Sequence, residues 1–214
     1  MGYEPENTLL SFKKAIKLGV DMIELDVHLC KSGELVVIRD KKVDRTTNGR
    51  GLISKKTRTE LKKLNAGKRQ KIPLLSEVID LVNKKIKINI EIKDKQAIPL
   101  VNQIIVDSVK KRWNYSHFLV SSFSQNILLK LKKINSKIRL GIIVSRSPVR
   151  IARYSKLGFY SVHLKKNIVN KKRVMKSHEK KLKVYVWTLD DIDKIKKVKS
   201  LGVDGIFSNY PDRI

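Results

Sequence analysis

Apolar and polar residues alternate along this chain in a pattern that predicts short strands separated by amphipathic helices. The predicted strands are nearly continuous apolar runs that end in polar residues, as expected for strands covered by helices. They span residues 22–27, 34–39, 87–92, 117–122, 139–144, 159–164, 183–188 and 204–209. Amphipathic stretches such as PLLSEVIDLVNKK and QNILLKLKKINSK lie between most of them. This alternation predicts a parallel α/β architecture.

Helix boundaries can be placed from capping residues. A first helix is predicted from Pro5 to about Leu18. The text LGVD occurs at 18–21 and again at 201–204, each time closing a predicted helix and opening a strand. Gly19 and Gly202 are therefore the predicted C-terminal caps of two helices.

One connection between strands contains no helix. Only the turn Lys31-Ser32-Gly33 separates IELDVHL from ELVVIR. A turn this short forces the two strands to run antiparallel, since a parallel pair needs a crossover of a dozen or more residues. We therefore expect a hairpin insertion at about residues 28–55, which returns Arg39 and Asp40 close to the end of IELD.

The strand count suggests a barrel. Without the hairpin, seven parallel strands remain, one fewer than a TIM (β/α)8 barrel needs. The missing strand belongs just before PENTLLSF. We expect a single domain over residues 1–214 that forms a TIM (β/α)8-type barrel without its first strand. If Met1 is an internal methionine of a longer reading frame, a late start accounts for that gap.

Composition narrows the class of protein. With 41% hydrophobic and 32% charged residues, the chain is expected to be globular. The single cysteine, Cys30, excludes an intrachain disulfide and favours a reducing compartment. The N-terminus lacks the pattern of a signal peptide, and the apolar runs are too short to cross a bilayer. These features predict a soluble, cytoplasmic protein.

The net charge of +28 requires an explanation. A basic chain attracts nucleic acid, anionic lipid or phosphorylated substrates. The lysine clusters, however, occur in predicted helices over the whole length, and only 6% of the residues are aromatic. Nucleic-acid modules concentrate charge on one face and interleave aromatic residues. We therefore expect no specific nucleic-acid partner and, at most, weak contact with an anionic membrane.

Acidic residues at the ends of two strands are the strongest candidates for chemistry. Glu24 and Asp26 are two positions apart on one strand, so both point to one face at its C-terminal end. Glu91 occupies the same place on the next parallel strand, and Lys93 follows on the same face. Converging carboxylates repel one another unless a cation joins them, and hard oxygen ligands favour Mg²⁺ or Ca²⁺. The alternative is that these residues are ordinary ion-pair partners.

Together these stretches resemble the glycerophosphodiester phosphodiesterase family, in order and over nearly the whole chain. The segments that carry the resemblance are PENTLLSFKKAIKLGVDMIELDV, KSGELVVIRDKKVDRTTNGRGLI, IPLLSEVIDL, NIEIK, SSF, VYVWT and GVDGIFSNYPD. The resemblance implies a TIM barrel that hydrolyses glycerophosphodiesters to glycerol 3-phosphate and an alcohol, with Mg²⁺ or Ca²⁺. It assigns the metal ligands to Glu24, Asp26 and Glu91, phosphate binding to Lys93, and a wall of the glycerol pocket to Trp187.

The chain departs from the family pattern at both general acid/base histidines. The first lies in a His-Arg-Gly strand end that would precede Met1. The second lies in a V-V-x-H-D motif, where this chain reads VVIRD and places Arg39. Arginine stays protonated, so Arg39 can hold a phosphate but cannot carry protons. The resemblance therefore implies a weak or inactive hydrolase; the alternative is a protein that binds phosphodiester headgroups or anionic membrane without turnover.

Other histidines are candidate substitutes for the missing pair. His28 shares the parity of Glu24 and Asp26, which makes it a speculative base, against a solvent-exposed alternative. His163 ends a predicted strand, so a substrate contact at the rim is expected. His117 and His178 are better interpreted as surface or structural residues.

Overall fold

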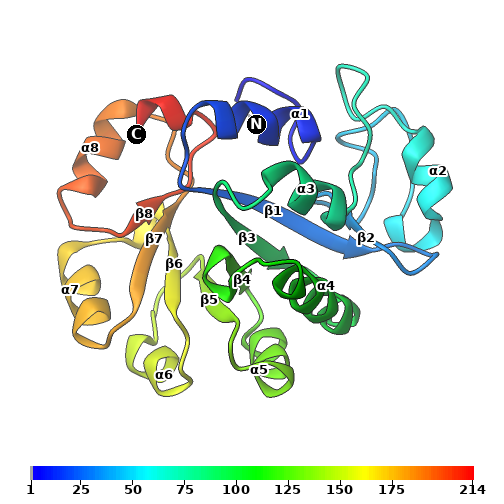
Figure 1. Cartoon of the computed structure of the whole chain (residues 1–214). Coiled ribbons are helices and arrows are strands. Elements are labelled where there is room, and N and C mark those ends of the chain that lie inside the picture. Colours follow the sequence, from blue (N-terminus) through cyan, green and yellow to red (C-terminus); the bar gives the residue numbers. More distant parts are fainter. Residues whose placement is uncertain (1) are drawn as a thin grey trace. The chain divides into compact units, whose positions relative to one another are not determined.

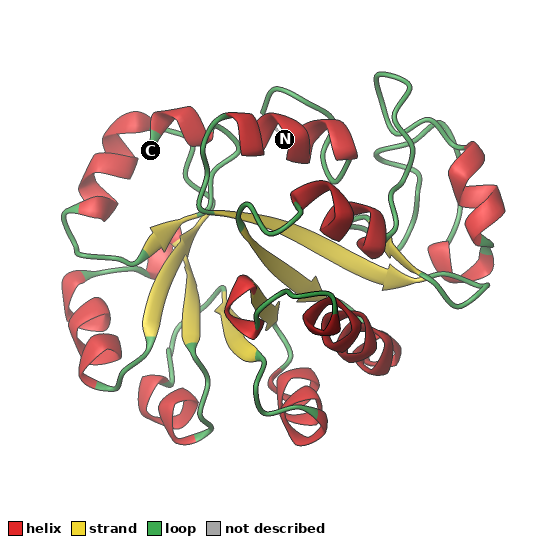
Figure 2. Cartoon of the chain, in the orientation of Figure 1, coloured by secondary structure: helices red, strands yellow, loops and turns green. Residues whose placement is uncertain are grey.

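A computed structural model describes residues 2–214, and Figures 1 and 2 show its elements. The chain forms two compact units, the first ending at Leu119 and the second running from Val120 to Ile214. The expectation of a late start concerns Met1, which lies outside the described residues. The single-domain assignment stays a prediction.

The described residues of the first unit form three complete strands and four α-helices. In chain order these are α1 (Leu9–Lys17), β1 (Met22–Leu29), β2 (Leu35–Val37), α2 (Arg58–Lys63), α3 (Leu75–Val82), β3 (Lys87–Ile92) and α4 (Ile98–Lys110). Short 3-10 turns lie at Ile53–Lys55, Lys95–Ala97 and Tyr115–His117. The strand β4 (Phe118–Ser122) begins at the end of this unit and continues into the next.

The second unit alternates strands and helices regularly. Its elements are α5 (Gln125–Ile134), β5 (Arg139–Val144), α6 (Ile151–Lys156), β6 (Ser161–Lys165), α7 (Lys171–Glu179), β7 (Lys183–Trp187), α8 (Ile192–Lys199) and β8 (Gly205–Ile206). Turns of 3-10 helix lie at Lys166–Ile168 and Pro211–Arg213. The strands β5 to β8 pair in chain order, each parallel to the next.

The predicted α/β fold and the hairpin are confirmed. β1 pairs with β2 antiparallel and with β3 parallel. β2 is shorter than the predicted strand 34–39: beyond Val37, whose amide bonds to Pro73 O, the chain keeps one backbone bond to β1, from Ile38 N to Asp26 O. β8 is also shorter than predicted, because the backbone N–H of Asn209 donates to the Asp190 carboxylate instead of a neighbouring strand.

The first helix begins later than its apolar pattern predicts. Thr8 caps it: its side chain accepts the Ser11 N–H at 3.2 Å, and the Ser11 hydroxyl oxygen accepts the Thr8 N–H. The Thr8 hydroxyl also donates to Pro5 O, which makes the residues before Leu9 a turn. Gly19 follows α1 with φ +75°, as its predicted role as a cap requires.

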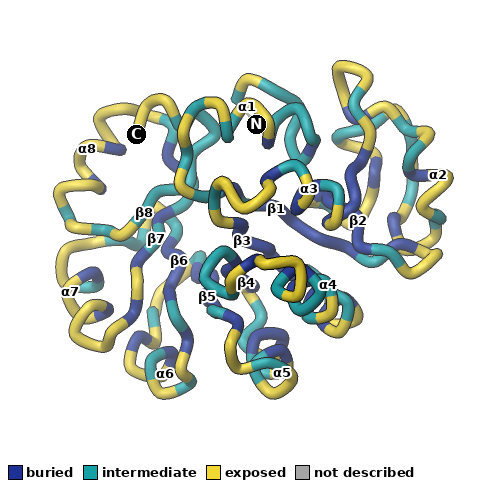
Figure 3. Tube along the Cα trace, viewed as in Figure 1, coloured by how far each residue is buried: buried dark blue, intermediate teal, exposed yellow. Residues whose placement is uncertain are grey.

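Buried residues follow the strands, whereas exposed residues gather on helix turns and loops (Figure 3). On β1, the buried apolar residues Ile23, Leu25 and Val27 alternate with the polar residues Glu24, Asp26 and His28. The segment that follows β1 has a small core of its own, formed by Cys30, Val36, Ile38, Val43, Ile53, Leu61, Ala66, Ile72 and Leu74. This core fixes the hairpin insertion against β1 and so positions Arg39.

Within residues 2–214 no helix has both the length and the apolar character that crossing a bilayer requires. The cytoplasmic location stays a prediction.

Candidate functional site

Three carboxylates meet on one face of the β1–β3 pair. The register places Asp26 opposite Glu91 and Glu24 opposite Asn89. Since side chains two apart on a strand share a face, all four point the same way. The ligand atoms of Glu24, Asp26 and Glu91 lie within 4.8 Å of one another. The structure thus brings together the three carboxylates that the sequence singled out.

Two cations and an amide contact the innermost carboxylate, that of Asp26, whose side chain is 1% exposed. Lys93 Nζ lies 2.8 Å from Asp26 Oδ1 and 2.5 Å from Glu91 Oε1. Arg39 Nε lies 3.3 Å from Asp26 Oδ2, so the hairpin delivers Arg39 where the sequence predicted. Asn7 Nδ2 donates to the same Oδ2 at 3.1 Å.

Asn7 is a residue that the sequence reasoning missed. It lies in the turn before α1 with φ +55°, a conformation that few residues other than glycine adopt. The signal available was its place just before the capping Thr8, where asparagine commonly forms turns. Its contact ties the start of α1 to the cluster.

The three carboxylates carry more negative charge than Arg39 and Lys93 balance. Burial raises the pKa of the Glu24 carboxyl well above its usual value, and repulsion from Asp26 and Glu91 adds to the rise. Burial also raises the pKa of Glu91, although Lys93 opposes it. Burial alone would raise the pKa of Asp26, but Lys93 and Arg39 beside it hold that pKa below its usual value. Glu24 is therefore the carboxyl that a further cation would stabilise most in its ionised form.

The donor set fits a hard divalent cation. All three groups are carboxylates, without a thiol or imidazole, which is the chemistry of Mg²⁺ and Ca²⁺ sites. Asn89, which is 1% exposed, adds a fourth oxygen on the same face, since its Oδ1 has no hydrogen-bond partner among the described residues. The residues present thus suit the ion class that the sequence predicted, and they do not select between the two metals.

His28 is buried rather than exposed. Its side chain is 3% exposed, with Nδ1 2.7 Å from Asp94 Oδ2 and Nε2 3.1 Å from the backbone oxygen of Arg39. Because a carbonyl oxygen only accepts, Nε2 carries a hydrogen in this arrangement. Both ring nitrogens are engaged, so service as a base would require one of these contacts to break. The assignment of His28 as a base stays a prediction.

The other two assigned residues belong to the second unit. Trp187 ends β7, donates from Nε1 to His163 O at 3.0 Å, and packs edge-on against Phe123 with ring centres 5.7 Å apart. His163 is 1% exposed, and its Nε2 lies 2.9 Å from Ser161 Oγ. The substrate contacts assigned to both residues stay predictions.

The burial of His163 makes stability depend on pH. Burial lowers the pKa of His163 to about 3, whereas an unfolded histidine titrates near about 6.5. The unfolded chain therefore binds the proton more readily, and stability is lost as pH falls from about 6.5 toward 3, by at most about 1.4 kcal/mol per pH unit. We expect urea midpoints measured between pH 7 and pH 4 to fall less steeply in His163→Gln.

Ser161→Ala is the matched control for that prediction. It removes the hydrogen-bond partner of His163 but keeps the buried imidazole, so the steep acid slope should persist. Equal slopes for wild type and His163→Gln would contradict the prediction.

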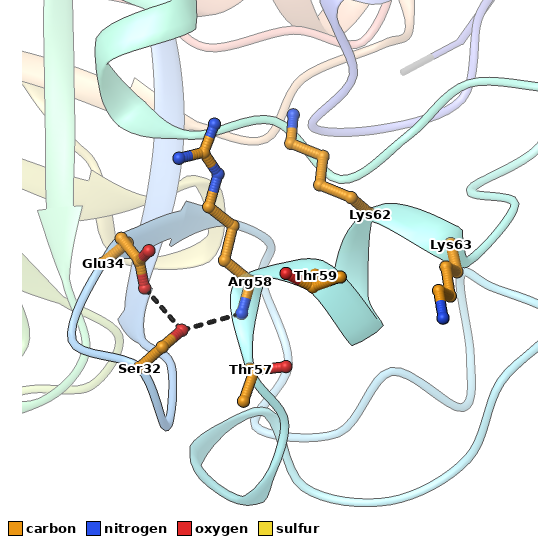
Figure 4. Close-up of a pocket in the computed structure, with 7 residues that line it drawn as sticks. All are labelled: Ser32, Glu34, Thr57, Arg58, Thr59, Lys62 and Lys63. Atoms are coloured by element: carbon orange, nitrogen blue, oxygen red, sulfur yellow. Dashed lines mark hydrogen bonds between the residues drawn. The ribbon is translucent and has the colours of Figure 1, made fainter.

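A separate pocket lies between the hairpin turn and α2 (Figure 4). Ser32 bridges its floor: its hydroxyl accepts the Arg58 N–H at 2.8 Å and donates to Glu34 Oε2 at 2.6 Å. The lining residues are Ser32, Glu34, Thr57, Arg58, Thr59, Lys62 and Lys63. None of the clustered carboxylates lines it, and its polar groups mainly hold α2 against the hairpin turn. We therefore place the functional site at the carboxylates.

Comparison with known proteins assigns the family. The model of the glycerophosphoryl diester phosphodiesterase family matches residues 1–213. A glycerophosphodiester phosphodiesterase of Caldanaerobacter subterraneus subsp. tengcongensis is 34% identical over 226 residues, which cover 98% of this chain and 90% of the relative. The chain belongs to the glycerophosphodiester phosphodiesterase family. A relative from Bacillus altitudinis with the same name is 34% identical over 225 residues, or 99% of this chain and 92% of its own.

Solved structures of phosphodiesterases share the fold. An Oleispira antarctica phosphodiesterase, in complex with the product sn-glycerol-3-phosphate, matches with a TM-score of 0.89 and 30% identity, covering 98% of this chain and 90% of that one. A Thermotoga maritima glycerophosphodiester phosphodiesterase matches with a TM-score of 0.82 and 29% identity, covering 98% and 91%. The family assignment made from the sequence is confirmed, and this glycerophosphodiester phosphodiesterase homologue carries its acidic cluster on β1 and β3.

Proposed function

We propose that this chain hydrolyses glycerophosphodiesters to glycerol 3-phosphate and an alcohol, slowly, with Mg²⁺ or Ca²⁺ held by Glu24, Asp26 and Glu91. The observation that carries the proposal is the meeting of three carboxylates with two cationic side chains. The family assignment and the product complex of the Oleispira antarctica relative support it. The finer form of the fold, a TIM (β/α)8-type barrel, belongs to the same proposal.

Charge balance favours a phosphodiester ligand. The ionised carboxylates carry three negative charges, and Arg39 and Lys93 carry two positive charges. A divalent ion would supply positive charge to the phosphoryl oxygens as negative charge develops on them. With such an ion the site carries one net positive charge, which a phosphodiester monoanion neutralises. Lys93, now bound to two carboxylates, is the residue that would turn to a phosphate oxygen.

Slow turnover follows from Arg39. A group that moves a proton at neutral pH typically contributes about 10²–10⁴-fold, and a guanidinium cannot do so. Arg39 is placed to hold a phosphate beside Asp26, but not to give or take its proton. This observation also favours the second candidate function, metal-dependent binding of phosphodiester headgroups without turnover.

The test is release of glycerol 3-phosphate from glycerophosphocholine and glycerophosphoglycerol, with Mg²⁺ or Ca²⁺, by the wild type and by Glu24→Ala. We expect slow release by the wild type that disappears in the variant, because the variant loses one of three ligands. If the folded wild type releases no more than the variant but binds the diesters in the presence of metal, the binding function replaces the hydrolase. If it does neither, both candidates fail.

A further inference from the structure

The two cations of the site belong to segments that do not pair with each other. Arg39 follows β2, and Lys93 follows β3, while β1 lies between these strands and pairs with both. Both ladders end before these residues: the β1–β2 register ends at Val37 and the β1–β3 register at Ile92. A further backbone bond, from Ile38 N to Asp26 O, holds the start of the Arg39 segment to β1. Backbone pairing therefore ties each segment to β1 but makes no direct link between Arg39 and Lys93.

A buried histidine links the two segments. His28, which lies on β1, contacts the backbone oxygen of Arg39 through its Nε2 atom at 3.1 Å. With Nδ1 it reaches Asp94 Oδ2 at 2.7 Å on the other side, and Asp94 is the residue after Lys93. The imidazole is 3% exposed, whereas the Asp94 side chain is 33% exposed. A hydrogen bond to a carboxylate in a buried setting is among the stronger ones available to a protein.

We infer that His28 and Asp94 form a positioning bridge that sets the spacing of Arg39 and Lys93, and that phosphate binding at these two cations depends on it. The inference rests on the proposed function, because it assumes that Arg39 and Lys93 receive the phosphate. It gives His28 a role in which neither nitrogen exchanges a proton with the substrate. The metal ligands themselves lie outside the bridge.

The bridge is tested with three variants: His28→Phe, Asp94→Ala and the double variant. His28→Phe fills the ring's space but makes neither hydrogen bond, and Asp94→Ala removes a partly exposed partner, so one variant remains informative if the other fails to fold. The matched control is His178→Phe, which breaks a histidine–carboxylate contact of 2.8 Å to Asp204 in the second unit. Calorimetric titrations measure binding of Ca²⁺ alone, and then of sn-glycerol 3-phosphate with Ca²⁺ present.

We expect each single variant to bind sn-glycerol 3-phosphate about tenfold more weakly, the effect of losing one charged hydrogen bond. The Ca²⁺ affinity should stay within about twofold, because no ligand is changed. Since both changes break one bridge, the double variant should bind no more weakly than the worse single variant. A role in general folding alone would lower both affinities together.

The inference is overturned if glycerol 3-phosphate binds the variants as it binds the wild type, if the two effects add, or if Ca²⁺ binding falls equally. Failure of the proposed function gives another pattern: the wild type itself, and the control with it, would then bind neither Ca²⁺ nor glycerol 3-phosphate. In that case the bridge has no phosphate to position, and the inference falls with the function.

Discussion

Replacing Asp26 with Asn is expected to weaken binding of Ca²⁺ or Mg²⁺ by at least about a hundredfold and to reduce glycerol 3-phosphate release to background. Asp26 is the most buried of the three carboxylates, and it alone contacts both cations. Two unit charges at 4 Å interact by about 4 kcal/mol at an effective dielectric constant of about 20. A hundredfold loss corresponds to about 2.7 kcal/mol, so it is a lower bound for removing a full charge beside a divalent ion.

The measurement is the rise in melting temperature that Ca²⁺ produces, together with direct titration. Wild type should melt at a higher temperature with metal, and Asp26→Asn should not. Asp190→Asn is a suitable control, because Asp190 also accepts three hydrogen bonds, but in the second unit, from Ser208 Oγ and from the backbone and side chain of Asn209. An Asp26→Asn variant that keeps the wild-type response to metal would rule out the proposed ligand set.

The carboxylate cluster could be predicted from the sequence because its evidence is local. Glu24 and Asp26 are two positions apart, so any strand puts them on one face. Glu91 ends the next parallel strand, and the register places it opposite Asp26. The hairpin was predictable for a similar reason, since the short turn at Lys31–Gly33 permits only an antiparallel return.

The contacts that complete the site join residues far apart in the chain, and no periodic pattern records them. Asn7 reaches Asp26 across 19 positions, and His28 reaches Asp94 across 66. Each depends on the conformation of a turn or loop, which apolar alternation does not determine. His28 shares the parity of Glu24 and Asp26 on β1, but parity does not reveal that both of its ring nitrogens are engaged.

His163 shows how a shift in a strand boundary changes an interpretation. The predicted strand 159–164 put it next to the rim, but β6 runs from Ser161 to Lys165, so two further strand residues follow it. The rings of Tyr185 and Phe207 pack against the imidazole, with ring centres 5.2 and 5.4 Å away. An apolar run with a histidine near its end looks the same in the sequence whether the ring faces solvent or the core.

Replacing Arg39 with His is expected to raise the rate of glycerol 3-phosphate release by about a hundredfold, the lower end of what one general acid or base contributes. The hairpin core and the bond from Ile38 N to Asp26 O place residue 39 beside the cluster whatever its side chain. An imidazole there can carry protons near neutral pH, which the guanidinium cannot. The same change removes a cation, so KM for the diester should rise while kcat increases.

Arg39→Gln separates these two effects. It removes the positive charge, as the histidine substitution largely does, but adds no group that can carry a proton, so it should raise KM without raising kcat. Steady-state kinetics of wild type and both variants, with saturating Ca²⁺ or Mg²⁺, distinguish the gain of a proton carrier from the loss of a positive charge. If Arg39→His and Arg39→Gln turn over at the same rate, the missing proton carrier at this position is not what limits the chain. A gain confined to Arg39→His would instead mean that the lack of a proton carrier at position 39 limits the rate of hydrolysis.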